Sequence, residues 1–181
     1  MATPAATAGY GAVNAVTYIT GTTHTKMLWP ESSIPSTFTV CSVTRYHGTV
    51  RQRILSCDFA PTQPLNWLHG HSGGVRGKAY YNVFPAMGAG DGRGLNDWLV
   101  MCGTNDAGVP TPGNIVMDQI GTGTVNGGQG GCRLHMGYVP ETSDWAFHSL
   151  LIWDYSLGTV PIPWHMRPCL CKLVILTVPF L

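Results

Sequence analysis

The chain has 181 residues, carries a formal net charge of +1 and contains only 10% Asp, Glu, Lys and Arg. This length fits one domain that buries about 70% of its unfolded surface, and so small a net charge gives no electrostatic basis for binding nucleic acid or an anionic membrane surface. Glu occurs only as Glu31 and Glu141, too few for the polar face of even one long helix. The composition therefore predicts an all-β protein.

Short strands should account for most of the chain, because apolar segments alternate with stretches rich in Gly and Asn. Residues 36–46 alternate in polarity, and a period of two residues is typical of a β-strand. Residues 50–55 follow a His-Gly-Thr connection that favours a hairpin. Residues 97–104 form a continuous apolar run, as expected of a strand buried on both faces. Three further strands are expected at 114–120, 131–137 and 144–156.

This order of strands and turns predicts a single β-sandwich or barrel domain over residues 1–181, with no internal repeat. The predicted core comprises Phe38, Val40, Trp98, Leu99, Val100, Leu150 and Ile152. Most of the Trp side chains should fill the core as well, since large aromatic side chains dominate protein interiors. Trp29 and Trp164 flank Pro-rich segments and are the candidates for exposed positions.

Residues 66–81 contain a His-x-His pair, His69 and His71. Residues i and i+2 of a strand point to the same face, so both imidazoles could reach one cation. A zinc site needs a third ligand with supporting hydrogen bonds, and no spacing fixes the position of another His. Alternatively, one His bonds a backbone carbonyl while the other faces solvent or a neighbouring strand. We favour this second interpretation, in which the pair belongs to a strand and binds no metal.

Six Cys residues could form disulfides in many combinations, and they lie at Cys41, Cys57, Cys102, Cys132, Cys169 and Cys171. Cys41 and Cys102 occur in apolar, strand-like runs, where a free buried thiol is equally normal. Both states stay open at this point, and the redox compartment stays open with them.

Four segments, taken in order, resemble one known family. They are SSIPSTFTVCSVTRYHGTVRQRIL (32–55), NWLHGHSGGVRGKAYYN (66–82), DWLVMCGTNDAG (97–108) and SDWAFHSLLIWDYSLG (143–158). Together they are similar to the concanavalin A-like/laminin-G-like jelly-roll domains, and most similar to a divergent branch found in surface and secreted proteins of microalgae. The resemblance covers about residues 11–158.

The resemblance implies two antiparallel sheets packed face to face as a jelly roll, and a non-catalytic role in binding carbohydrate or protein. It also implies a place outside the cell, at the cell surface or in an organelle lumen. The chain departs from the family at two points. Ser72 follows the His-Gly-His where members often have an aromatic residue, and an apolar tail at 159–181 replaces a short acidic helix.

The sequence offers little for catalysis. Jelly-roll glycosidases use two carboxylates about 5 to 9 Å apart on one strand face, but neither Glu31 nor Glu141 has a suitably spaced acidic neighbour. No Gly-x-Ser-x-Gly segment is present to carry a nucleophilic Ser. We therefore expect a binding protein and not an enzyme.

Oxygen-bearing side chains gather in two loops that could form a ligand-binding rim. The predicted ligand-binding residues are Asp91, Asn96, Asp97, Asn105 and Asp106. Calcium prefers such hard donors, and the resemblance adds to this case because some laminin-G-like domains hold calcium at a loop rim. A metal, if bound, should be calcium at Asp91, Asp97 and Asp106. The alternative is that these side chains only stabilise turns.

The tail ends in a run at 169–181 with one charged residue, Lys172, and an almost wholly apolar remainder. As a helix it would be about 20 Å long, too short for a hydrocarbon core of about 30 Å, so we expect no transmembrane span. It should be buried, either as an edge strand of the sandwich or against a partner chain. Burial on a partner would support an alternative function as a structural or accessory subunit of a larger extracellular, lumenal or membrane-associated assembly.

Overall fold

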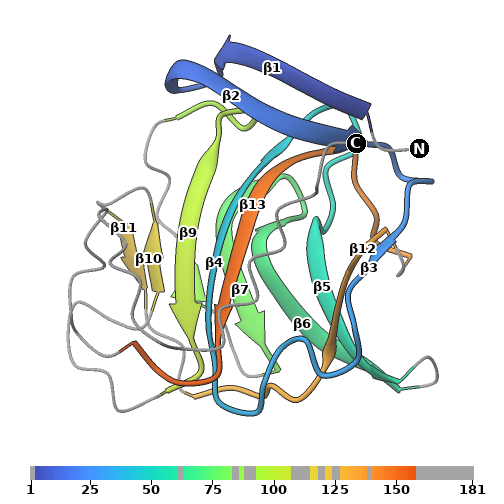
Figure 1. Ribbon diagram of the computed structural model, residues 1–181, viewed down its shortest axis with the longest axis vertical. Coiled ribbons are helices and arrows are strands. Elements are labelled where there is room, and N and C mark those ends of the chain that lie inside the picture. The colour runs from blue at the N-terminus through green and yellow to red at the C-terminus, as the bar shows by residue number, and fades with distance from the viewer. Residues whose placement is uncertain are drawn as a thin grey trace.

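The computed structural model describes residues 3–60, 63–82, 86–87, 93–106, 115–117, 121–123, 127–137 and 140–157. Within these ranges the chain forms strands, turns and bends without a helix, so no helix there could cross a membrane. Figure 1 shows the strands arranged in two layers. Asp91, Trp164 and the tail at 159–181 lie outside the described residues, so what was predicted for them stays a prediction.

The first layer, sheet A, has seven strands in the order β1-β2-β13-β4-β9-β10-β11. They are β1 (Thr3–Gly9), β2 (Ala12–Gly21), β13 (Trp145–Trp153), β4 (Thr39–Tyr46), β9 (Leu99–Thr104), β10 (Ile115–Met117) and β11 (Gly121–Gly123). The second layer, sheet B, has six strands in the order β3-β12-β5-β6-β7-β8. They are β3 (Met27–Leu28), β12 (Arg133–Met136), β5 (Leu55–Ala60), β6 (Gln63–Ser72), β7 (Val75–Tyr81) and β8 (Ala86–Met87). Every neighbouring pair is antiparallel, which confirms the predicted all-β sandwich.

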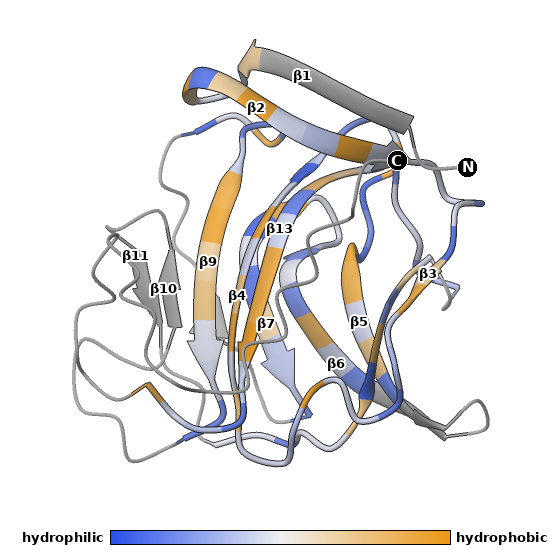
Figure 2. Ribbon diagram, viewed as in Figure 1, coloured by the Kyte–Doolittle hydropathy of each residue, from blue (hydrophilic) through white to orange (hydrophobic). Residues whose placement is uncertain are grey.

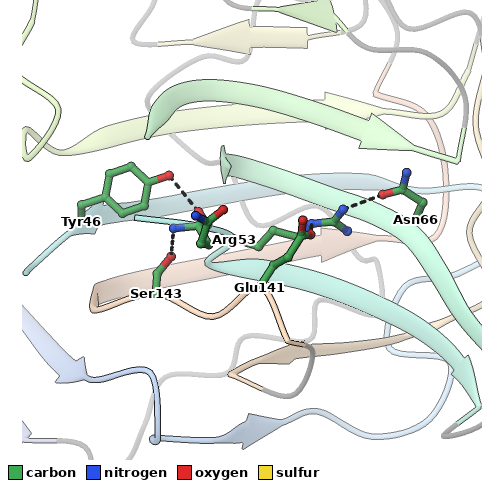
Figure 3. A network of polar contacts seen from close by, with 6 residues as sticks. Tyr46, Arg53, Asn66, Glu141 and Ser143 are labelled. Atoms are coloured by element: carbon green, nitrogen blue, oxygen red, sulfur yellow. Dashed lines mark hydrogen bonds and ion pairs between the residues drawn. The ribbon is translucent and has the colours of Figure 1, made fainter. Parts of the chain in front are cut away.

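The hairpin predicted between residues 36–46 and 50–55 is wrong. β4 lies in sheet A and β5 in sheet B, so the intervening chain crosses between the layers. This crossing is held by the segment that precedes β13, as Figure 3 shows. The Gln52 amide donates to Ser143 Oγ at 2.7 Å and the Arg53 amide to the Glu141 carbonyl at 3.1 Å. Because side-chain and loop partners satisfy these backbone groups, the segment does not need a neighbouring strand.

The space between the sheets is filled by large apolar side chains, and Figure 2 shows apolar stretches on β5, β9 and β13. Five predicted core residues are confirmed there: Phe38, Val40, Leu99, Leu150 and Ile152. Trp98 is also buried, but it packs with Tyr18 and Ala146 in a second cluster. Val100 is only half-buried because burial alternates along β9, contrary to the prediction that this strand is covered on both faces. Trp29 is 6% exposed and lies in the core, so it is not a surface residue.

In the described part of the chain, two disulfides join distant segments. Cys41 of β4 pairs with Cys102 of β9, and Cys57 of β5 pairs with Cys132, which directly precedes β12. The second bond closes a loop with a sequence separation of 75 residues. Cross-links of this kind stabilise a fold largely by restricting its unfolded chain.

The strands β1 and β2 form a hairpin that we call the arm, and it lies across one end of sheet A in Figure 1. Only the last three residues of β2, Ile19 to Gly21, pair with β13. Residues 12–18 pair with β1 alone among the described strands. The arm therefore carries its turn beyond the paired part of the sheet, to the region where β9 begins.

Candidate ligand-binding site

The turn of the arm reaches the segment in front of β9 and is fixed there. Tyr10 and Gly11 both have left-handed backbone, with φ of 54° and 79°, as two-residue type I′ hairpin turns require. The Trp98 amide donates to the Tyr10 carbonyl at 2.8 Å. This hydrogen bond joins two segments that are far apart in sequence and sets the position of the Tyr10 ring.

A buried guanidinium lies beneath that ring. The Cζ atom of Arg45 is 3.9 Å from the centre of the Tyr10 ring, 5.3 Å from that of Tyr18 and 5.2 Å from that of Trp98. Arg45 is 1% exposed, so its cation–π contacts are desolvated, and such contacts are worth about 2 kcal/mol or more. The rings of Tyr18 and Trp98 also pack edge to face, with 5.3 Å between their centroids. These contacts therefore fix the end of the arm on the sandwich. We call the four residues the Arg45 cluster: Tyr10, Tyr18, Arg45 and Trp98.

The hydrogen bonds of Arg45 involve neutral acceptors. Its Nη1 donates to the Tyr46 carbonyl at 3.0 Å and its Nη2 contacts Nδ1 of His47 at 3.1 Å. No carboxylate among the described residues pairs with this buried charge. Since a guanidinium only donates hydrogen bonds, Nδ1 of His47 must present its lone pair. Partial burial and the Arg45 charge lower the pKa of His47, and the Asp144 carboxylate opposes them.

The 93–98 segment lies beside the Tyr10–Gly11 turn. Asp97 closes a tight turn, in which its Oδ2 accepts from the Gly94 amide at 2.9 Å and its own amide donates to the Gly94 carbonyl at 2.9 Å. A Cβ placed on Gly11 would lie 3.5 Å from the Asp97 side chain, so the two turns are in close proximity. The Oδ1 atom of Asn96 is buried and has no hydrogen-bond partner. The Asp97 side chain thus lies beside the Tyr10–Gly11 turn.

The same end of the sandwich carries exposed apolar side chains. Tyr10 is 46% exposed, Val13 94% and Leu95 42%. The exposed side chain of His47 lies 6.3 Å from the Tyr18 ring, measured between ring centroids. Exposed apolar residues gathered together and bordered by polar ones are typical of an interaction surface. We call Tyr10, His47, Asn96 and Asp97 the Tyr10 site.

The predicted rim is divided by the structure. Asn96 and Asp97 precede β9, whereas Asn105 and Asp106 follow it. The six residues of β9 place its two ends roughly 20 Å apart, and calcium ligands lie within about 2.6 Å of the ion. The described members therefore do not form one calcium site, and Asp91 lies outside the described residues. Asn105 instead stabilises loops, because its Oδ1 accepts from the Phe38 amide and its Nδ2 donates to the Ser36 and Gly128 carbonyls.

The prediction that His69 and His71 belong to a strand is confirmed by β6, but neither side chain faces solvent, since both are 0% exposed. Nδ1 of His69 contacts the Tyr81 hydroxyl at 2.8 Å, and its Nε2 lies 3.2 Å from the Met101 carbonyl. Because that carbonyl can only accept, Nε2 carries the proton and Nδ1 accepts from Tyr81. Burial lowers the pKa of His69 to about 4. Both nitrogens are thus engaged within the protein.

His71 is the more strongly perturbed of the pair. Its Nδ1 lies 3.3 Å from Thr44 Oγ1. Its pKa falls to about 3, chiefly through burial and then through the nearby charge of Arg76. No group of three or more His, Cys, Asp or Glu side chains in the described part of the chain is placed to hold a metal ion.

A second polar cluster, which the sequence analysis missed, lies on sheet B. Ser56 and Asp58 share one face of β5, and His135 of β12 is opposite Ser56 in the register. His135 Nε2 lies 3.0 Å from Asp58 Oδ2, and burial lowers its pKa more than Asp58 raises it. These are the residue types of a Ser-His-Asp triad, but Ser56 Oγ makes no hydrogen bond within the described chain. A triad has a hydrogen bond between nucleophile and base, and the described contacts of Ser56 and His135 do not include one.

A further network in Figure 3 stabilises the crossing between the sheets. Arg53 contacts the Glu141 carboxylate through Nε and donates to Asn66 Oδ1 at 2.8 Å through Nη2. The Glu141 side chain is 54% exposed, so the ion pair contributes little, about 0–1 kcal/mol. Its role is to hold a loop, as the backbone hydrogen bond between the same two residues also does.

Comparisons of the chain with protein-family models, with curated proteins and with solved structures gave no match. The chemistry of the Tyr10 site therefore has to be inferred from its own side chains.

Proposed function

We propose that this chain is a non-catalytic recognition module that binds carbohydrate at the Tyr10 site. The observation that carries the proposal is the half-exposed Tyr10 ring, which is fixed over Arg45 in a turn that lies next to the Asp97 side chain. An aromatic ring offers a rigid apolar surface for the C–H face of a sugar. The Asp97 carboxylate offers a partner for its hydroxyl groups.

We also propose that the sandwich is a jelly roll of the concanavalin A-like/laminin-G-like type, because the four segments that carry the resemblance contribute β4, β6, β7, β9 and β13. An extracellular or lumenal location is part of this proposal. The two disulfides support it, since disulfides persist in oxidising compartments.

A glycan array tests the binding proposal. The full chain should bind at least one class of printed oligosaccharide, and Tyr10→Ala should weaken that binding about tenfold or more, because an aromatic contact contributes about 0.5–1.5 kcal/mol beyond its buried area. Tyr10→Phe keeps the ring and should retain most of the affinity. Tyr80→Ala, at a half-buried Tyr on β7 of the other sheet, is the matched control.

The array also gives the results that would reject the proposal. Absence of binding to every printed glycan by the folded wild-type chain would reject carbohydrate recognition. Equal binding by wild type and Tyr10→Ala would leave a carbohydrate-binding protein but remove the Tyr10 site. Melting temperatures of all three variants establish that the fold is intact before binding is compared.

A further inference from the structure

The Arg45 cluster depends on an unusual partner for its buried charge. In place of a carboxylate, Arg45 has the lone pair of His47 Nδ1, at 3.1 Å, and the Tyr46 carbonyl, at 3.0 Å. The contact with His47 exists only while the imidazole is neutral, because a protonated ring has no acceptor. Protonation would replace a hydrogen bond by two positive charges in contact, one of them 1% exposed.

We propose that Arg45 is a positioning residue for the Tyr10 ring, and that it holds the ring in place only while His47 is neutral, so that the Tyr10 site is lost in acid. This inference rests on the proposed function for the identity of the ligand. The movement of the arm that it implies can be measured without any ligand.

The charged groups around His47 favour an exchange of partners. Arg45 faces it from β4, Asp144 from the segment before β13, and the Tyr18 ring from β2. The His47 amide already donates to the Asp144 carbonyl at 3.1 Å. Asp144 packs against Gly48, where any Cβ would collide with its carboxylate. A protonated His47 would thus be repelled by Arg45 and attracted by the nearby Asp144 carboxylate.

Loss of the His47 contact would be transmitted to the arm through Arg45. Its guanidinium would keep the Tyr46 carbonyl as its one hydrogen-bond acceptor, and a buried charge with too few acceptors is costly. The ring that most easily uncovers it is that of Tyr10, which is 46% exposed, whereas Tyr18 and Trp98 are each 5% exposed. Water could then reach Arg45 once the Tyr10 turn moved away from Trp98.

Amide hydrogen exchange of Trp98 reports this movement directly, because its N–H donates to the Tyr10 carbonyl. The protection factor of Trp98, corrected for the intrinsic effect of pH, should fall about tenfold or more between pH 7 and a pH at which NMR shows His47 protonated. His47→Gln can still accept from Arg45 but does not titrate, so its protection should change less than about twofold. His47→Lys should be unprotected already at pH 7.

Two controls separate this inference from general acid effects. His24→Gln removes another exposed imidazole and should behave as the wild type does. The amide of Trp29, which donates to the Leu134 carbonyl elsewhere in the sandwich, reports the loss of global stability expected from His69 and His71, and all changes at Trp98 are taken relative to it.

The same oligosaccharide array, printed at both pH values, provides the binding readout. Wild type should lose signal about tenfold in acid, and His47→Gln should retain it. Unchanged Trp98 protection in a chain whose His47 is protonated would overturn the inference, as would an equal loss in His47→Gln. If no glycan binds at either pH, the proposed function fails, and the exchange of Trp98 still decides the role of Arg45.

Discussion

The buried pair His69 and His71 should make the stability of the fold depend steeply on pH. In the unfolded chain both imidazoles have an ordinary pKa near 6.5, whereas burial lowers it to about 4 for His69 and about 3 for His71. Between those values and 6.5 the unfolded state binds more protons, so the free energy of unfolding falls as pH falls. From pH 7 to pH 5 each His should cost the fold close to 2 kcal/mol, and the pair about 4 kcal/mol.

Urea denaturation followed by Trp fluorescence at pH 7 and pH 5 measures this difference. Gln can replace either imidazole as acceptor and donor but does not titrate, so His69→Gln and His71→Gln should each remove about 2 kcal/mol of the pH-dependent change, whatever their stability at pH 7. His24→Gln, at an exposed position, is the matched control. If the free energy of unfolding falls equally between pH 7 and pH 5 in wild type and in the double Gln variant, this reasoning is refuted.

Three further predictions concern stability and metal binding. Gly21→Ala should destabilise the fold severely in thermal melts, because its Cβ would collide with the Trp145 ring, and a melting temperature within a few degrees of wild type would contradict this. Replacing Cys57 and Cys132 by Ala should lower the free energy of unfolding by about 2–5 kcal/mol in urea, as expected for a long closed loop; a loss below about 0.5 kcal/mol would show that this bond does not stabilise the fold. Calorimetry should detect no zinc binding at His69 and His71, because both side chains are buried and His69 uses both of its nitrogens. Tight zinc binding that is lost in His71→Ala would contradict this prediction.

The strands were predictable where local pattern decides structure. Polar and apolar residues alternate at residues 36–46, and this period of two predicted β4 correctly, although β4 is buried along nearly its whole length. The prediction failed for residues 50–55, because their apolar ends resemble a strand while their backbone partners lie some 90 residues away, at Glu141 and Ser143. Long-range partners of this kind leave no mark in a short window of sequence.

The candidate site was only partly predictable for the same physical reason. The sequence predicted Asn96 and Asp97 as oxygen donors in a loop, and Asp97 does lie beside the Tyr10–Gly11 turn. Their predicted partners, Asn105 and Asp106, are near in sequence but lie at the opposite end of β9, because the extended strand runs between the two pairs. The role of Arg45 could not be predicted, because its aromatic partners are distant in sequence and only the folded arm brings them to it. The Gly9-Tyr10-Gly11 segment was the available signal, as Gly on both sides of an aromatic residue favours a tight turn that displays its ring.

The most direct test of carbohydrate binding at the Tyr10 site is an NMR titration of the isotopically labelled full chain with the oligosaccharide that gives the strongest array signal. Binding at the Tyr10 site predicts that the largest amide shift changes fall at residues 9–13, 47 and 93–98, with little change at residues 103–106 or on sheet B. Shift changes centred on the Ser56, Asp58 and His135 face of sheet B, with the arm unaffected, would contradict it.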